Sequence, residues 1–174
     1  MTILTVAKCN REDDDGGVHI RPIDPTDKAL LAEGLRHLSE ASVRLRFLSS
    51  KPSFTAGELR YLTEVDGHDH IALVAIDDDT GCLIGVARCV RLEGRPDTAE
   101  MAIVVGDPWQ GQGIGRQLAE ELSAAARAAG IRRFEALVQA GNAPARAVAR
   151  RIAARLQEGD VSAGVRELSL DLAA

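Results

Sequence analysis

Residues 101–130, MAIVVGDPWQGQGIGRQLAEELSAAARAAG, decide the fold of this chain. Residues 101–105 form a continuous apolar run that ends in three β-branched side chains, which is typical of a strand buried on both faces. Gly106 and the Asp-Pro pair after it break the strand. Over residues 114–129 apolar side chains recur at helical spacing, and Gly130 stands where a glycine often ends a helix. We therefore predict a strand, a tight turn and a long helix.

The turn between this strand and this helix contains three glycines spaced two apart, Gly111, Gly113 and Gly115. Glycine allows the backbone to approach a ligand closely. The first turn of a helix presents unpaired N–H groups at the positive end of the helix dipole. Such a turn favours an anion, and phosphate is the group most often bound in this way. A glycine-rich turn without any ligand is the simpler alternative.

The glycine spacing excludes two common phosphate-binding motifs. A dinucleotide fingerprint, G-x-G-x-x-G, would need a third glycine where Arg116 or Leu118 stands. A P-loop would need Gly-Lys-Ser or Gly-Lys-Thr, and neither triplet occurs in the sequence.

Gln110-x-x-Gly113-x-Gly115 resembles the Q/R-x-x-G-x-G/A motif of the GNAT acyltransferase superfamily, whose loop amides hold the pyrophosphate of acetyl-CoA. The resemblance implies acetyl-CoA as co-substrate. It also implies that the main chain of the preceding strand pairs with pantetheine, and that an N–H near Val104 or Val105 serves the oxyanion of the acyl-transfer reaction. Asn142 falls where the family often has a cofactor contact, although an ordinary helix N-cap explains it equally well. The implied cofactor-binding residues are Ile103, Val104, Val105, Gln110, Gly111, Gln112, Gly113, Ile114, Gly115, Arg116 and Asn142.

The remaining patterns predict an α/β sandwich with a mixed, mostly antiparallel sheet flanked by helices, which is the GNAT fold. We expect residues 1–17 to be a flexible segment, because they contain an acidic run and paired glycines, and residues 18–174 to be a single GNAT domain. The predicted strands are 18–21, 71–76, 82–92, 99–105, 133–138 and 165–172. The predicted helices begin after Asp24-Pro25, at Ser42, after Thr55, at Gly113 and at Ala143, the last one reaching Leu156.

Three further blocks are similar to the catalytic domain of bacterial Pat-type protein lysine acetyltransferases. These blocks are SVRLRFLSS at 42–50, ELRYLTEVDGHDHIALVAI at 58–76 and AEMAIVVGDPWQGQGIG at 99–115. The similarity implies that the acceptor is a primary amine and favours a protein lysine. A small-molecule amine is the alternative acceptor.

Glu100 is the candidate catalytic base. An alkyl amine must lose a proton before it attacks a thioester. Strand alternation puts Glu100 on one face with Ala102 and Val104. A carboxylate at the start of an apolar strand is costly unless it is paired or solvated, and burial favours its uptake of a proton. The matching Glu is the proposed base of the Pat-type family, whereas an exposed strand end is the simpler alternative.

One departure from the GNAT pattern is informative. The family often has a tyrosine in the last helix that protonates the leaving thiolate, and Ala149 occupies that position here. No general acid can be named, so a non-catalytic acyl-CoA-binding sensor remains an alternative. Arg44 and Arg46 are candidates for contact with an acidic acceptor, although charged helix residues are more often simply solvated. His68 and His70 flank Asp69 just before a predicted strand. A catalytic or acceptor-binding role is one interpretation of this pattern, and three half-exposed residues at the start of a strand are the favoured one.

Composition sets the remaining expectations. A formal net charge of −5 argues against a nucleic-acid partner. The three cysteines lack metal-ligand spacing, so we expect no metal. No stretch is long and apolar enough to span a membrane, and the apolar N-terminal run is too short for a signal peptide, which predicts a cytoplasmic protein. The sequence does not indicate an oligomeric state.

Overall fold

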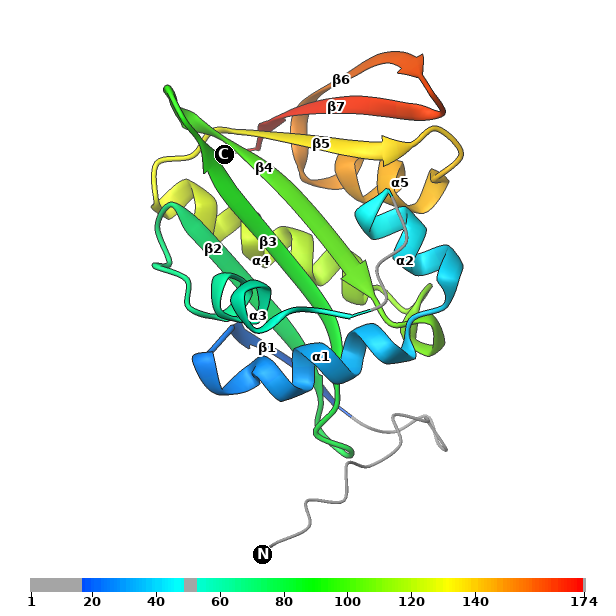
Figure 1. Ribbon diagram of the computed structural model, residues 1–174. Helices are drawn as coiled ribbons and strands as arrows, with labels where there is room; N and C mark the ends of the chain where they lie inside the picture. The colour runs from blue at the N-terminus through cyan, green and yellow to red at the C-terminus, as the bar shows by residue number, and fades with distance from the viewer. Residues whose placement is uncertain (1–16, 49–52, 174) are drawn as a thin grey trace, which may run out of the picture.

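The computed structural model describes residues 17–48 and 53–173. These residues form one seven-stranded sheet in the order β1-β2-β3-β4-β5-β7-β6 (Figure 1). Every neighbouring pair is antiparallel except β4 and β5, which are parallel, so the predicted mixed, mostly antiparallel sheet is confirmed. The strands are β1 Val18–Pro22, β2 His70–Asp77, β3 Leu83–Leu92, β4 Arg95–Val105, β5 Arg133–Gln139, β6 Ala153–Ser162 and β7 Val165–Leu172.

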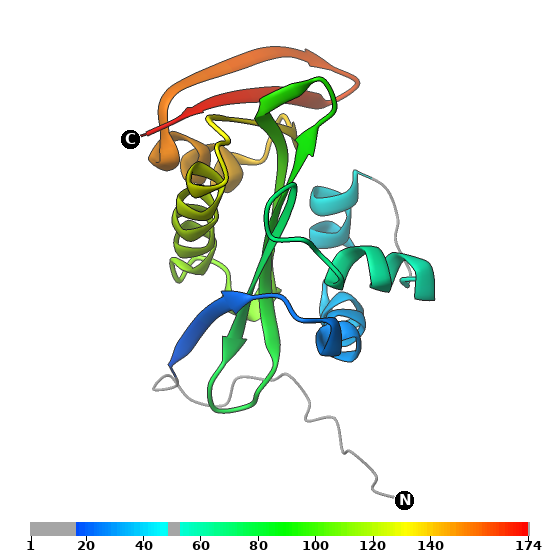
Figure 2. The same cartoon turned by 90° about the vertical axis from the view of Figure 1, so that its left-hand side faces the viewer.

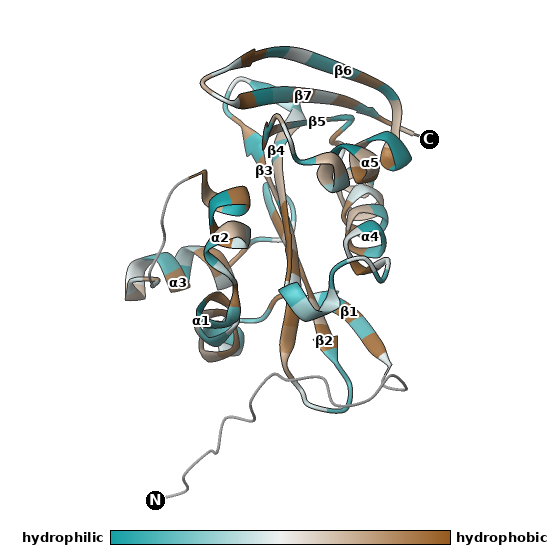
Figure 3. Cartoon of the chain, turned by 90° about the vertical axis from the view of Figure 1, so that its right-hand side faces the viewer, coloured by the Kyte–Doolittle hydropathy of each residue, from teal (hydrophilic) through white to brown (hydrophobic). Residues whose placement is uncertain are grey.

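The helices divide between the two faces of the sheet. Figure 2 shows α1 (Lys28–His37), α2 (Glu40–Phe47) and α3 (Ala56–Thr63) on one face, and α4 (Ile114–Ala128) and α5 (Ala143–Ile152) on the other. Short 3₁₀ turns, η1 (Pro25–Asp27) and η2 (Asp107–Trp109), lead into α1 and out of β4. Coloured by hydropathy, the strands between the two helical layers are largely apolar (Figure 3).

The sheet is covered on both faces by aliphatic cores. All of β2 is buried, and side chains from alternating positions enter the two clusters. Leu118 and Leu122 of α4 are fully buried in the larger cluster, and Leu31 of α1 packs against the opposite face. Val74 is fully buried in the smaller cluster, on the sheet face that Leu31 of α1 covers. The low aromatic content therefore gives a core of branched aliphatic side chains packed from both sides.

Local sequence signals specify several helix ends. Asp24 forms a capping box at η1 and Thr55 forms one at α3, next to the predicted starts of the first and third helices. Gly130 has φ +85° directly after α4, where a side chain would be strained.

The C-terminal part differs from the prediction. The helix predicted over 143–156 ends at Ile152, and residues 153–162 form β6, which the sequence analysis missed. The run AARLQ has high intrinsic helix propensity, and β6 buries little of its surface, so it lacks the alternation that marks a strand. Pairing with β7 overrides this propensity. Arg155, expected on a helix, therefore lies on a strand. Residues 1–16 of the predicted flexible segment lie outside the described residues.

Asp107 joins the two layers at the end of β4. Its Oδ2 accepts from the Ser39 backbone N–H at 2.9 Å, and its Oδ1 accepts from the hydroxyls of Ser39 at 2.7 Å and Ser42 at 2.8 Å. Ser39 is itself the N-cap of α2. Burial opposes ionisation of Asp107, but these hydrogen bonds outweigh it and lower its pKa below the usual value. Asp107 therefore fixes α2 to the turn that follows β4.

We expect Asp107→Ala to lower the free energy of unfolding by about 1–3 kcal/mol, because three hydrogen bonds to one carboxylate are lost. The folded pKa of Asp107 is depressed, so its contribution is complete above about pH 4 and is lost as the pH falls further. Urea unfolding at pH 7 and at pH 3 measures both effects. Asp79→Ala, at an exposed turn position, is the control and should change little. An equal loss for the two variants at pH 7 would contradict the assignment.

Candidate functional site

The central feature of the site is the separation of β4 from β5. The two strands pair only from Thr98–Arg133 to Glu100–Glu135, and beyond these residues they diverge (Figure 1). Residues 101–105 of β4 therefore have no strand partner on the β5 side within the described chain. Backbone N–H and C=O groups on such an inner edge are available to a ligand that lies between the strands.

The glycine loop lies at the open end of this gap. Gly111 has φ +78° and Gly113 has φ +88°, so both adopt the left-handed conformation that glycine tolerates. A Cβ built on either residue would meet no heavy atom within 4 Å, so both backbones border open space. Gly113 is the N-cap of α4, and no side chain caps the helix. The loop thus combines left-handed glycines with a helix start that no side chain caps, and its binding of an anion stays a prediction.

The glutamine side chains of the loop have structural roles. Gln110 Nε2 donates to the Val105 carbonyl at 3.0 Å and to the Ser42 hydroxyl at 3.1 Å. Gln112 Nε2 donates to the Pro108 carbonyl at 2.9 Å. Trp109 is buried in the core beneath the loop. These contacts hold the loop in place, and its main chain remains the part suited to a phosphate.

The other predicted cofactor residues surround the same gap. Ile103, Val104 and Val105 are half-buried along the diverging part of β4. At the start of α4, Ile114 is buried, whereas Arg116 is exposed. A Cβ on Gly115 would touch Val105 Cγ2 at 3.5 Å, which brings the helix start against the strand end.

Asn142 caps α5. Its side chain accepts from the Ala145 backbone N–H at 3.1 Å, so the N-cap interpretation is confirmed. Contact of Asn142 with the cofactor stays a prediction.

Glu100 lies where the two strands part. It is the last residue of β4 that pairs with β5, and its side chain is exposed. The exposed strand end of the simpler alternative therefore describes the position of Glu100, and its role as a base stays a prediction. Glu100 has no hydrogen bond or ion pair with any described residue, whereas the neighbouring Glu135 accepts from Arg95 Nη2 at 2.7 Å. Glu100 is thus the free carboxylate at the inner end of the gap.

A basic cluster that the sequence analysis largely missed shares the sheet face of Glu100. Strand register places Arg88 of β3 and His70 of β2 on this face. Arg88 is buried; its Nη1 lies 3.0 Å from His70 Nε2, and its Nη2 donates to the Leu62 carbonyl at 3.2 Å. The Tyr61 ring lies against the His70 ring at a centroid distance of 4.9 Å. The signal was an arginine in the middle of the apolar run LIGVARCV.

Electrostatics define this cluster further. Burial, and then the positive charge of Arg46, lower the pKa of Arg88 to about 10. Burial, and then the charge of Arg88, lower the pKa of His70, so His70 is neutral at neutral pH and accepts the Arg88 hydrogen bond. His68 and Asp69 are exposed and interact with each other. The histidines of the HDH sequence therefore do not act together.

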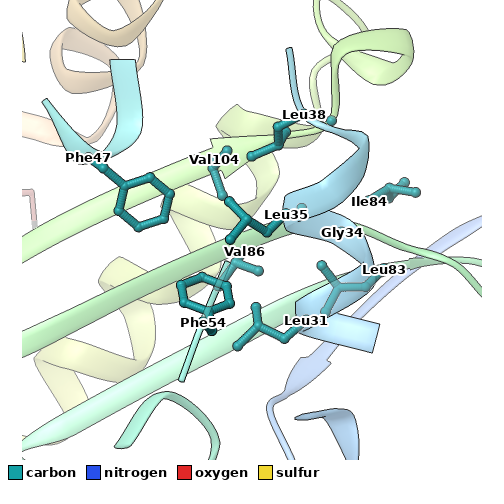
Figure 4. Close-up of a pocket in the computed structure, with 12 residues that line it drawn as sticks. Leu31, Gly34, Leu35, Leu38, Phe47, Phe54, Leu83, Ile84, Val86 and Val104 are labelled. Atoms are coloured by element: carbon teal, nitrogen blue, oxygen red, sulfur yellow. The ribbon is translucent and has the colours of Figure 1, made fainter. Parts of the chain in front are cut away.

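An apolar cavity of about 50 Å³ lies between α1 and the sheet (Figure 4). Leu31 and Leu35 line it from the helix, Val86 and Val104 from the sheet, and Phe47 and Phe54 close one side. It is lined by no charged side chain, and it lies under α1 on the sheet face that Val104 shares with Glu100.

Two negative observations complete the geometry. In the part of the chain that the structure describes, no helix is long and apolar enough to cross a membrane. Among the same residues, no group of three His, Cys, Asp or Glu side chains is arranged to hold a metal ion.

Comparisons with known proteins agree with this geometry. The profile of the Acetyltransferase (GNAT) family matches residues 36–153. Acetyltransferase Pat of Mycolicibacterium smegmatis is 35% identical over 136 residues, which cover 78% of this chain but only 40% of that protein. This chain therefore spans less than half the length of that relative.

Two solved structures extend the comparison. The GNAT domain of S. lividans PAT superposes with a TM-score of 0.79 at 29% identity, covering 89% of this chain and 90% of that one. A phosphinothricin acetyltransferase from Sinorhizobium meliloti, in complex with AcCoA, has a TM-score of 0.71 at 21% identity, covering 89% and 88%, and shows likeness of fold. Fold, loop geometry and family match agree, and the chain belongs to the Acetyltransferase (GNAT) family of enzymes.

Proposed function

We propose that this protein transfers an acetyl group from acetyl-CoA directly to a primary amine. The observation that carries the proposal is the gap between β4 and β5, with an uncapped helix start at one end and an unpaired carboxylate, Glu100, at the other. This arrangement suits a long ligand with a phosphate at one end and a reactive group at the other. Acetyl-CoA supplies an activated thioester when it is bound.

Different residues around the gap would bind different parts of acetyl-CoA. The main-chain N–H groups of residues 111–116 would bind the pyrophosphate, because they lie at the positive end of the α4 dipole. The free edge of residues 103–105 would pair with the pantetheine amides as a neighbouring strand does. An N–H of Val104 or Val105 would stabilise negative charge on the acetyl oxygen.

Glu100 would accept the proton that the amine loses as its nitrogen bonds to the acetyl carbon. The side chain is exposed and makes no competing ion pair with a described residue, so an incoming amine can reach it directly or through one water. No general acid is assigned, because Ala149 is a buried residue of α5 without an acidic group. A thiol has a pKa near ~8.5, so the thiolate leaves without one.

We propose that the acceptor is a primary amine, without choosing between a protein and a small molecule at this point. A protein lysine is supported by the resemblance to Pat-type enzymes, and a small-molecule amine is the second candidate within the same chemistry. A non-catalytic acyl-CoA sensor is the candidate of another class, and the residue at position 149 is the observation that favours it.

Glu100→Gln should lower kcat by about 10²- to 10⁴-fold, because the base is lost while the shape is kept. Its affinity for acetyl-CoA should stay unchanged. Thiol release with an amine panel measures the first quantity, and titration calorimetry measures the second. Glu135→Gln is the matched control, since it removes a neighbouring carboxylate that is already paired with Arg95. Equal loss in both variants would rule out a specific role for Glu100, and absence of turnover in the wild type would favour the sensor.

Gly113→Ala should weaken coenzyme A binding by about tenfold or more, because the substitution strains a residue with φ +88° and puts a methyl group into the proposed phosphate cradle. Gly94→Ala is the matched control. Gly94 has φ +73° and similarly open surroundings, but it lies in the β3–β4 turn. Calorimetry should show a weaker Kd for Gly113→Ala alone. A similar loss of affinity for both variants would indicate general destabilisation and count against the cradle.

A further inference from the structure

Helix α2 lies over the gap between β4 and β5 on the face that contains Glu100. Asp107 holds the start of the helix to the end of β4. At the other end of α2, the Arg44 carbonyl accepts from Gln139 Nε2 at 3.4 Å, which ties the helix to the end of β5. The last turn of α2 therefore lies beside the gap between β4 and β5 (Figure 1).

Arg46 lies in this last turn and has no partner of opposite charge in contact. Its guanidinium carbon lies 4.9 Å from the centre of the Phe47 ring, and it makes no hydrogen bond or ion pair with any described residue. Burial lowers the pKa of Arg46, and the negative charge of Glu100 partly offsets this effect. A half-buried guanidinium without a hydrogen-bonded anion is costly, so it is suited to bind one.

Helix α2 packs against β4, and the negative charge of Glu100 acts on Arg46, although the two groups do not form an ion pair. Neither group has a hydrogen bond or an ion pair with another described residue. A molecule with a negative and a positive end would pair with both groups at once. Arg44, on the same helix, is different, since it is exposed and lies 3.6 Å from Glu40.

Arg88 adds a second positive charge beneath this space. Its side chain is buried, and its hydrogen-bond partners are a neutral imidazole and a carbonyl, so no described carboxylate neutralises it. Apart from the Arg95–Glu135 ion pair, the described residues of the face around Glu100 therefore include two guanidinium groups, those of Arg46 and Arg88, and the carboxylate of Glu100, which has no ion pair. This excess of positive charge favours a bound anion.

We propose that the acceptor is a small amine that also carries a carboxylate, as an amino acid does. Arg46 binds the carboxylate while the amine faces Glu100. The role of this molecule as an acceptor rests on the proposed acetyl transfer. Its binding is argued separately, from the charged side chains of this face. The side chain of a protein lysine has an amine but no carboxylate of its own, so it would leave Arg46 without an anionic partner.

Two exposed apolar side chains suit the hydrocarbon part of such an acceptor. Tyr61 of α3 is 58% exposed beside His70, and Leu137 of β5 is 56% exposed. Alternation along β5 places Leu137 on the same face as Glu135, and therefore as Glu100. Both are more exposed than the other large apolar side chains of the described residues.

The test compares wild type with Arg46→Gln on matched acceptors: amino acids, their decarboxylated amines, and lysine peptides with uncharged flanks. Wild type should prefer the amino acids. Arg46→Gln should lose about 10- to 100-fold in kcat/KM on amino acids, mainly through KM, and change less than about threefold on the amines. Arg44→Gln, which removes an equal charge from the same helix, should behave as wild type. Arg46→Lys should retain part of the preference, because it keeps the charge but loses the planar fork.

Calorimetric binding of the same acceptors separates this inference from the proposed function. Amino acids that bind wild type and lose affinity in Arg46→Gln support the inference even if no turnover is seen. Preference of wild type for neutral amines or for lysine peptides would overturn it, with acetyl transfer intact. An equal loss for all acceptors in Arg46→Gln would also overturn it, because the substitution would then act on the fold of α2.

Discussion

The structure depends on one constraint, the end of parallel pairing between β4 and β5 at Glu100 and Glu135. A sheet normally pairs its interior strands along their length, because unpaired backbone groups are costly when they are shielded from water. Here the inner edge of β4 is free beyond Glu100 while both faces of the sheet remain packed by helices. The free edge of β4 begins where the two strands part. Glu100 lies at that point, and the glycine loop lies beyond the other end of the free edge.

In the proposed reaction, the two faces of the sheet serve different parts. On the α4 side, loop N–H groups and the helix dipole favour phosphate. On the α2 side, Arg46, Arg88 and Glu100 would present charges to the proposed acceptor. Asp107 joins the faces, since it follows β4 directly and caps α2 through Ser39. The position of the acceptor face is therefore coupled to the strand that would hold the co-substrate.

The sequence predicted the parts whose determinants are local. Glycines with positive φ, the capping box at Thr55 and the apolar strand at 101–105 can be read directly from residue types. The strand β6 could not, because its structure comes from pairing with β7 against a helical propensity. The exposure of Glu100 and the partners of Arg88 depend on which strands and helices pack together. Local sequence patterns do not specify those contacts, so neither feature could be predicted from them.

Amide hydrogen exchange with and without acetyl-CoA is the most direct test of the central claim. If the gap between β4 and β5 holds the co-substrate, the amides of residues 101–105 and 111–116 should become protected on binding, while those of β1 and β2 at the far side of the sheet should not change. Unchanged exchange in both segments at saturating acetyl-CoA, or protection confined to another part of the chain, would contradict the account.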